Sequence, residues 1–230
     1  MNKISIIIPV FNEAKNINQL LSHLEQSAGE GSNLEIIIVD GGSCDGIAEI
    51  IKTDTNVHFI ESEKGRAKQM NAGAKMARGA ILYFLHCDSF PPKNFDLLIQ
   101  NEVDRGNKAG CFKMQFDYGH PVLRISQWFT RFNHLSCRGG DQSLFITKDL
   151  FEEINGFNAQ LIIYEDNEII SRLYQQKQFT VIQKSIITSA RRYRKNGVWR
   201  LQYHFFMIHI KYRLGHSPES MLQYYRKKIK

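Results

Sequence analysis

Cysteine is scarce in this sequence, and its cysteines are far apart. Cys44, Cys87, Cys111 and Cys137 form no closely spaced pair, which argues against a zinc knuckle or a redox-active pair. We therefore expect free thiols, as is usual in a reducing cytoplasm.

Long apolar runs are also missing. No segment approaches the roughly 20 apolar residues of a membrane span, and the N-terminus lacks the apolar stretch and cleavage site of a signal peptide. We predict a cytoplasmic protein that is soluble or that attaches to the inner face of the membrane. Its 230 residues, 43% of them hydrophobic, suit one domain with a sizeable core.

Acidic residues are nearly absent from the C-terminal segment. The net charge is +7, but residues 191–230 contain 11 Lys and Arg and one acidic residue, and the remaining chain has a balance of −3. Basic and aromatic residues interleave in this segment, which suits a helix at an anionic membrane surface. A phosphate-bearing ligand or a solvated helical face are the alternatives. No recognition motif accompanies the charge, so no nucleic-acid partner is expected.

Two common nucleotide-binding motifs are absent as well. No G-x-G-x-x-G follows a strand, and no G-x-x-x-x-G-K-[ST] occurs. Neither a Rossmann dinucleotide site nor a P-loop is therefore supported.

The N-terminal half alternates strand-like apolar runs with helical patterns. The apolar runs of strand length lie at residues 4–8, 34–39, 57–60 and 80–85. Pro9 is expected to end the first strand, and Asn12 to cap the next helix. This order predicts an α/β fold with an open, mostly parallel sheet and helices on both faces. We predict that residues 1–190 form this domain and that residues 191–230 form a helical extension packed on it.

Polar residues follow the predicted strands, at the edge where an open α/β sheet binds ligands. Asp40 ends its strand, and Gly41 and Gly42 allow a ligand to approach the backbone closely. We predict a nucleoside site here, although turn formation alone would also explain Asp40. Asp45 is expected either to contact a ribose or to cap a helix.

A second group of residues suits a diphosphate and a metal. Asp88 follows a hydrophobic strand, and Mg²⁺ or Mn²⁺ favours carboxylate oxygens, with substrate phosphates completing the shell. His86 is a second ligand, a hydrogen-bonding partner or a loop-packing residue. Lys64, Gly65 and Arg66 place cations beside a helix start, which suits an anion, although a solvated loop would look the same.

A third group opens a predicted helix at residues 165–175. An acceptor hydroxyl needs a base to take its proton as it attacks. Asp166 is the candidate base, and Glu165 is expected to orient it or the acceptor. Acidic residues in a first helical turn also favour the helix dipole, which is the structural alternative.

In combination, these segments resemble family-2 glycosyltransferases with a GT-A fold. The segments that carry the likeness are residues 6–13, 39–46, 65–73, 84–89, 156–157 and 165–166. Residues 84–89 occupy the place of the family's D-x-D motif, with His86 instead of its first acidic residue. In this histidine and in residues 140–145, 189–193 and 212–219, the sequence resembles a bacterial subgroup of the family with an H-x-D motif.

The resemblance implies an inverting enzyme that moves one sugar from a nucleotide-diphosphate donor to an acceptor hydroxyl, with Mn²⁺ or Mg²⁺. It assigns Asp88, with His86, to the metal and Asp166, with Glu165, to catalysis. The Q-x-x-R-W motif of processive relatives is absent, so a single transfer is expected. The residues expected to hold the donor are Pro9, Phe11, Asn12, Glu13, Asp40, Gly41, Gly42, Ser43, Asp45, Lys64, Gly65, Arg66 and Gln69.

Two other functions remain open at this point. The histidine at the D-x-D position weakens the expected metal site, which motivates a non-catalytic nucleotide-sugar-binding or membrane-surface module. A nucleotidyltransferase is the other alternative, although residues 9–13 lack the glycine-rich loop usual in such enzymes.

Overall fold

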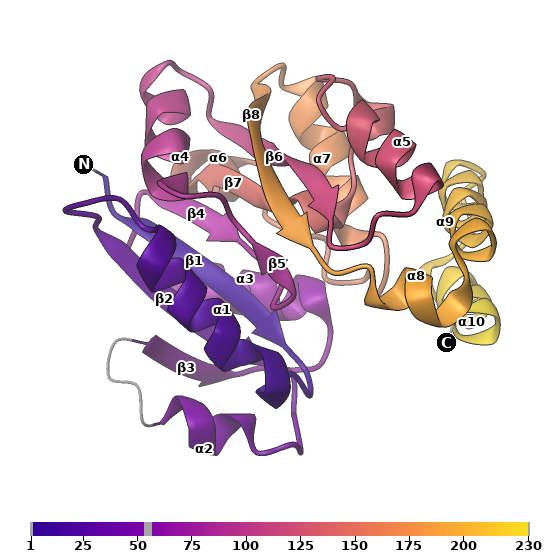
Figure 1. Ribbon diagram of the computed structural model, residues 1–230, viewed down its shortest axis with the longest axis horizontal. Coiled ribbons are helices and arrows are strands. Elements are labelled where there is room, and N and C mark those ends of the chain that lie inside the picture. The colour runs from indigo at the N-terminus through magenta and orange to yellow at the C-terminus, as the bar shows by residue number, and fades with distance from the viewer. Residues whose placement is uncertain (1, 53–56, 230) are drawn as a thin grey trace.

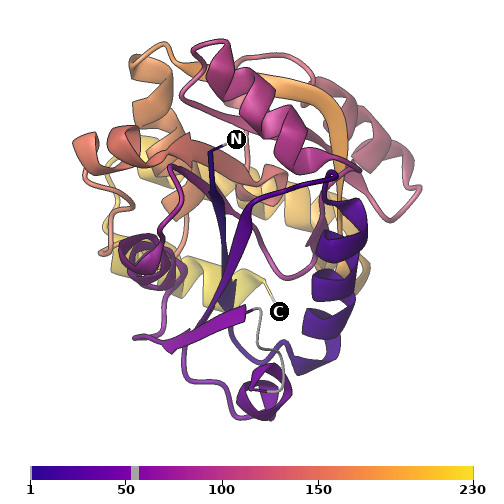
Figure 2. The ribbon, with the colours of Figure 1, turned by 90° about the vertical axis from the view of Figure 1, so that its left-hand side faces the viewer.

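A computed structural model describes residues 2–52 and 57–229 of the chain. They form an eight-stranded sheet in the order β3-β2-β1-β4-β7-β6-β8-β5, with helices on both of its faces (Figures 1 and 2). The strands are β1 (Ile4–Val10), β2 (Leu34–Asp40), β3 (Val57–Glu61), β4 (Ile81–Phe84), β5 (Ser89–Phe90), β6 (Ala109–Phe116), β7 (Leu144–Thr147) and β8 (Phe179–Thr188).

The helices alternate with the strands and then close the chain. The α-helices are α1 (Ala14–Ser27), α2 (Ile47–Ile51), α3 (Arg66–Met76), α4 (Phe95–Asp104), α5 (Pro121–Phe129), α6 (Lys148–Glu153), α7 (Glu165–Gln175), α8 (Arg191–Asn196), α9 (Val198–Arg213) and α10 (Pro218–Lys228). Two 3₁₀-helices, η1 (Leu135–Cys137) and η2 (Gly140–Gln142), lie in the connection between α5 and β7.

The N-terminal half is the parallel part of the sheet. β3, β2, β1 and β4 pair in parallel, and every residue of β1 is buried, as expected for a strand covered on both faces. α1 and α3 lie on opposite sides of these strands (Figure 2). α3 approaches closely because Gly73 faces the sheet, where a Cβ would lie 2.4 Å from the Ile7 side chain.

Two local predictions are wrong. β1 does not stop before Pro9 but continues to Val10. β4 pairs with β1 only as far as Ile7, so the missing N–H of Pro9 lies beyond that ladder and costs it no hydrogen bond. Asn12 does not cap α1, because Glu13 occupies the cap position and Asn12, with φ of 55°, turns toward the neighbouring loop.

The second half of the sheet is mixed. β7 runs antiparallel to both β4 and β6, β8 is parallel to β6, and the short β5 is antiparallel to β8. The α/β fold with a mostly parallel sheet is thus confirmed, with antiparallel pairs confined to this half.

The C-terminal helices pack on the sheet domain. Tyr193, Leu201 and Ile208 share a buried hydrophobic cluster with Phe116 of β6 and Leu123 of α5. The residue 190 boundary itself remains a prediction, and positions 1 and 230 of the two predicted ranges lie outside the described residues.

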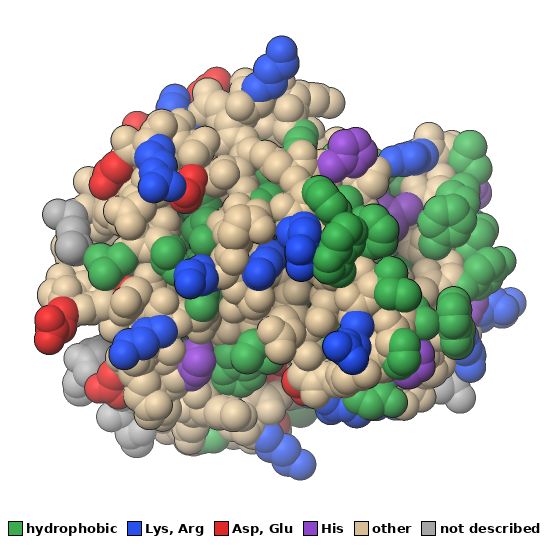
Figure 3. All heavy atoms as spheres, turned by 45° about the horizontal axis from the view of Figure 1, so that its top comes forward, with side chains coloured by type: hydrophobic (Ala, Val, Ile, Leu, Met, Phe, Trp, Pro, Cys, Tyr) green, Lys and Arg blue, Asp and Glu red, His purple; other side chains and the backbone are tan. Residues whose placement is uncertain are grey.

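Within residues 2–52 and 57–229, no helix is both long and apolar enough to cross a bilayer. Hydrophobic side chains are nonetheless exposed in groups. Figure 3 shows such groups on one face, with Lys and Arg beside them, over the side of the molecule where α5 and α9 lie.

A glycine in the middle of the mixed half offers a test of the packing. We expect Gly110→Ala to destabilise the protein by about 1–3 kcal/mol, as overpacking does, because its Cβ would lie 2.5 Å from the Thr180 carbonyl and 2.7 Å from the Phe145 ring. Gly119→Ala is the matched control, since a Cβ there meets nothing within 4 Å. Urea unfolding measures both, and equal midpoints would contradict the β6 register.

Candidate active site

A large cavity lies between the N-terminal half of α3, the loop before α7 and the C-terminal helices. Its volume is about 1970 Å³. The predicted site residues that line it are Phe11, Lys64, Gly65, Arg66, Gln69, Glu165 and Asp166. The predicted site residues outside its lining are Pro9, Asn12, Glu13, Asp40, Gly41, Gly42, Ser43, Asp45, His86 and Asp88. Most of the latter belong to the loops that support the cavity.

Asp40 organises the turn that follows β2. Its carboxylate accepts hydrogen bonds from the backbone N–H groups of Gly42 (3.2 Å) and Ser43 (2.9 Å) and from the Ser43 hydroxyl. The backbone N–H of Asn12 donates to Ser43 Oγ (2.8 Å), and Asn12 Oδ1 accepts from the N–H of Cys44 (3.0 Å). These bonds join the loops after β1 and β2 into one platform.

Asp45 accepts hydrogen bonds from the first residues of two helices beside this platform. Asp45 Oδ2 accepts a hydrogen bond from the N–H of Ala14, the first residue of α1 (2.8 Å), and Oδ1 accepts a longer one from the N–H of Ile47, the first residue of α2 (3.4 Å). Asp45 does not hold either N-cap position, which belongs to Glu13 in α1 and to Gly46 in α2, but it satisfies N–H groups at both helix starts. Contact with a ribose remains a prediction.

Gln69 and Phe11 connect the platform to the cavity. The Gln69 amide donates to the carbonyls of Val10 and Val39 at the strand ends, both at 2.8 Å. Phe11 is 38% exposed, and Lys64 Nζ lies 3.5 Å from the centre of its ring. The cavity thus begins with an aromatic face beside a cation, an arrangement that suits a flat, anionic ligand.

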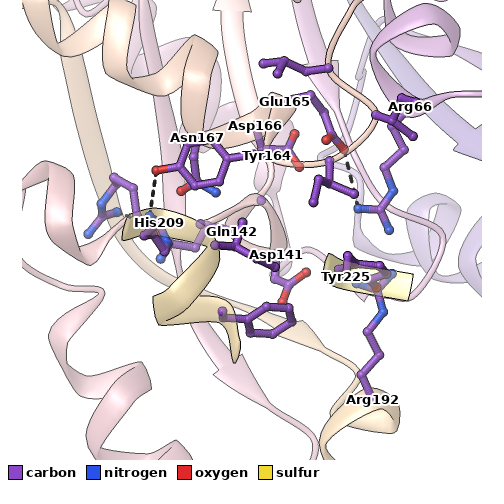
Figure 4. A pocket seen from close by; sticks show the side chains of 18 of the residues that line it. Arg66, Asp141, Gln142, Tyr164, Glu165, Asp166, Asn167, Arg192, His209 and Tyr225 are labelled. Atoms are coloured by element: carbon purple, nitrogen blue, oxygen red, sulfur yellow. Dashed lines mark hydrogen bonds and ion pairs between the residues drawn. The ribbon is translucent and has the colours of Figure 1, made fainter. Parts of the chain in front are cut away.

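Glu165 and Asp166 begin α7 and line the cavity, and each carboxylate lies beside a different basic side chain. Glu165 Oε1 lies 3.7 Å from Arg66 Nη1, and Asp166 Oδ2 lies 3.5 Å from His86 Nε2. Figure 4 shows Glu165 directed at Arg66, with Asp141 and Arg192 placed around the same space. His86 thus lies beside the candidate base, and its role as a metal ligand remains a prediction.

The environments of the two carboxylates shift their pKa values in opposite directions. Burial first, and the charge of Asp166 second, raise the pKa of Glu165 to about 7. Burial alone would also raise the pKa of Asp166, but the hydrogen bond and charge of His86, together with Arg66 and Arg192, lower it below the usual range. Two carboxylates with opposite shifts are typical of acid–base sites.

Asp141 is a member of this cluster that sequence reasoning missed as a site residue. It lines the cavity, and burial raises its pKa against the opposing charges of His86, Arg192 and Arg66. The preceding Gly140 is in close contact with the candidate base, since a Cβ there would lie 2.1 Å from Asp166 Oδ2. The signal available in the sequence was a glycine pair next to an aspartate, since Gly139 and Gly140 precede Asp141 as Gly41 and Gly42 follow Asp40.

Asp88 and Glu13 share a cation from the C-terminal segment. Arg191 Nη2 lies 3.0 Å from Glu13 Oε1 and 3.9 Å from Asp88 Oδ2. The charge of Asp88 also acts on Arg66 and Asp141, so Asp88 is electrostatically part of the cavity although it does not line it.

The described residues supply an incomplete shell for a divalent metal. Among them, no group of three or more His, Cys, Asp and Glu side chains is placed to hold an ion. Asp88, with a side chain 32% exposed, offers one carboxylate, whereas the Nε2 atom of His86 faces Asp166. This donor set fits a Mg²⁺ or Mn²⁺ ion that arrives with a donor whose phosphates provide further ligands.

Comparison with known proteins places this chain in a family. Residues 5–155 match the model of glycosyl transferase family 2. The glycosyltransferase AglE of Haloferax volcanii is 37% identical over 176 residues, covering 69% of this chain and 57% of that protein. The undecaprenyl-phosphate 4-deoxy-4-formamido-L-arabinose transferase of Proteus mirabilis is 24% identical over 201 residues, covering 84% of this chain and 58% of that protein. The chain thus spans less than two thirds of these relatives.

Solved structures agree on the fold. Residues 1–349 of S. aureus TarS, crystallised with UDP, superpose with a TM-score of 0.67 at 20% identity, covering 82% of this chain and 60% of that one. The complex of the same protein with UDP-GlcNAc gives a TM-score of 0.64 at 20% identity, covering 81% and 58%. Since the family model spans more than half of the chain, this protein belongs to glycosyl transferase family 2.

Proposed function

We propose that this protein is an inverting glycosyltransferase that moves one sugar from a nucleotide-diphosphate donor to an acceptor hydroxyl. The observation that carries the proposal is Asp166, a largely buried carboxylate that lines the cavity and is kept ionised by His86 and two arginines. An ionised carboxylate beside a cavity large enough for two substrates is what a direct displacement requires.

The donor is assigned to the platform side of the cavity. Phe11, with Lys64 above its ring, would stack on the base, and Asp40 and Ser43 would orient the nucleoside from the turn behind it. Arg66 and Arg192, which line the cavity, would attract the diphosphate. UDP is the first nucleotide to test, because TarS was crystallised with UDP and with UDP-GlcNAc.

The reaction is a single displacement. The acceptor oxygen attacks the anomeric carbon, Asp166 takes the hydroxyl proton, and the bond from that carbon to the diphosphate oxygen breaks. Because the oxygen enters opposite the leaving group, the anomeric configuration inverts. Asp88 would hold the divalent ion, which when bound neutralises the leaving diphosphate, and Arg66 would add positive charge on the same group.

The acceptor is assigned to the other side of the cavity, toward α5, α9 and α10. Apolar side chains line this side, among them Phe129, Phe205, Ile208 and Leu222. An acceptor with an apolar portion fits such a wall. The Proteus relative, whose name carries undecaprenyl phosphate, makes a polyprenyl-linked compound the first acceptor to test.

Donor binding can be tested without knowing the acceptor. We expect UDP with Mn²⁺ to stabilise the protein, by about 2.7 kcal/mol at a hundred times its Kd, and expect EDTA to remove much of this gain. Asp88→Asn should abolish the difference between Mn²⁺ and EDTA, whereas the exposed Asp104→Asn should not. Thermal shift of the unaltered protein and of the two variants, each with Mn²⁺ and with EDTA, measures these effects.

The same measurement, combined with an assay of UDP-sugar hydrolysis and transfer, separates the alternatives. Stabilisation by UDP without hydrolysis or transfer of any UDP-sugar would favour the non-catalytic binding module. That alternative was motivated by the histidine at the D-x-D position, and the contact of His86 with Asp166 gives this histidine a place in the enzyme hypothesis. Stabilisation by nucleoside triphosphates alone would favour the nucleotidyltransferase. No response to any nucleotide would contradict the assigned donor site.

A further inference from the structure

Four large apolar side chains stand exposed on α5 and the turn after it. Ile125 is 62% exposed, Trp128 46%, Phe129 47% and Phe132 45%; we name them the α5 patch. The Trp128 ring centre lies 5.2 Å from that of Phe129 and 5.0 Å from that of Phe132. Clustered aromatic exposure of this kind marks an interaction surface more than scattered single residues do.

The exposure is built into the fold and does not reflect a loose helix. Leu123 of α5 is fully buried. Gln127 Oε1 accepts from the N–H of Phe116 (2.9 Å), and Thr130 Oγ1 accepts from the N–H of Met114 (3.0 Å). The helix is therefore anchored to β6 by its inner side, and the α5 patch is its outward side.

The surroundings of the α5 patch are positive. No acidic residue occurs between Asp117 and Asp141. Arg124 is exposed, and the Arg131 guanidinium lies 4.8 Å from the Trp128 ring centre. Figure 3 shows hydrophobic and basic side chains side by side over this part of the molecule.

α9 carries a second exposed strip of the same character. Trp199 is 73% exposed, Tyr203 58% and Phe206 62%, and their spacing places them on one side of the helix. This strip lies in the C-terminal segment that holds 11 basic residues and one acidic residue. The two aromatic surfaces thus have the same sign of charge.

Charge complementarity selects the occupant. A second copy of this chain would bring basic surfaces against basic surfaces, which is unfavourable. An anionic bilayer offers the opposite charge, and Trp with Arg is the combination favoured at the level of lipid headgroups. We propose that the α5 patch, together with the α9 strip, docks this protein on the surface of an anionic membrane.

Docking would also place the cavity at the membrane. Phe129 belongs to the α5 patch and lines the cavity, so the patch and the acceptor side of the cavity are continuous. An acceptor with an apolar chain could then reach Asp166 with its chain left at the bilayer. This last step rests on the proposed function, whereas docking does not.

Binding to sucrose-loaded vesicles tests the docking with the full chain. We expect sedimentation with phosphatidylcholine vesicles containing phosphatidylglycerol, and little with phosphatidylcholine alone. Arg124→Gln/Arg131→Gln should weaken binding roughly 30-fold, given about 1 kcal/mol for each basic residue near the surface. Lys15→Gln/Lys75→Gln removes the same charge from exposed positions on α1 and α3 and should change binding little. If the two double variants weakened vesicle binding equally, binding would depend only on net charge, and the α5 patch would not be the docking surface.

The two tryptophans report which surface inserts. In Trp199→Phe the remaining Trp128 should shift its emission to the blue and be quenched by brominated lipid. If only Trp199, observed in Trp128→Phe, responds, the tail docks alone and the α5 patch is excluded. UDP stabilisation should be unchanged in Arg124→Gln/Arg131→Gln, so loss of membrane binding with donor binding intact is distinguishable from failure of the proposed function.

Discussion

Asp166→Asn is expected to lower the rate of sugar transfer by about 10²–10⁴-fold, the usual contribution of a positioned base. Asparagine keeps the shape of the side chain but cannot accept the acceptor proton. Donor affinity should change little, because the proposed site for the base is at Phe11 and Lys64, which line the cavity apart from Asp166 in the chain. Transfer rate and UDP-dependent thermal shift measure the two effects separately.

Glu165 is the competing base, and its titration makes the competition testable. Its pKa is raised to about 7, first by burial and then by the charge of Asp166. If Glu165 took the proton, activity would require its ionised form and would fall about tenfold between pH 8 and pH 6. The lowered pKa of Asp166 keeps that residue ionised throughout this range, so a rate that depends on it should stay nearly constant.

Glu165→Gln completes the comparison. The variant removes the partner of Arg66, 3.7 Å away, and is expected to cost less activity than Asp166→Asn. A larger loss in Glu165→Gln, combined with a rate that falls between pH 8 and pH 6 in the unaltered protein, would transfer the role of base to Glu165.

Gly140→Ala should reduce activity about 10²-fold without replacing any polar group. A Cβ at this position would lie 2.1 Å from Asp166 Oδ2, so the carboxylate must rotate away from its place beside His86. A displacement of about 1 Å in a catalytic group can cost this much. The Cβ would also lie 2.7 Å from Asp166 Cγ and 3.0 Å from Asp166 Cβ, so the start of α7 must shift slightly as well, and we expect a loss of stability of about 1–3 kcal/mol, as for overpacking elsewhere.

Gly139→Ala is the neighbouring control. A Cβ at Gly139 meets nothing within 4 Å, and its φ of −163° is extended backbone that alanine adopts. This variant should retain most of the activity and unfold at the same urea concentration. If Gly140→Ala were as active as Gly139→Ala, the position of the Asp166 carboxylate would not limit the reaction.

Much of the fold was predictable because its causes are local. The parallel strands are buried on both faces, so they appear as continuous apolar runs such as residues 4–8. The sheet domain and α7, with its bounds at 165 and 175, follow from such patterns. The error at Pro9 arose because strand ends depend on how far the neighbouring β4 extends, which β1 alone does not indicate.

The chemistry of the site was predictable only in part. Polar residues at strand ends and the acidic pair at 165–166 point to a nucleotide-sugar site because their residue types suit that chemistry. Their partners do not appear in the pattern. The sequence did not indicate that His86, a candidate metal ligand, lies beside Asp166, or that Arg191 meets Glu13 from 178 positions away.

The residue types and their order along the chain therefore determined the α/β class, the family and the identity of most candidate groups. Tertiary structure alone decided which charges meet, that Gly140 lies against Asp166, and that the aromatic residues of α5 face outward beside the cavity. The physical reason is the separation along the chain over which each effect acts. Burial and helix or strand periodicity act between residues a few positions apart, whereas the pKa of a carboxylate depends on whichever side chains the folded chain brings within a few ångströms of it.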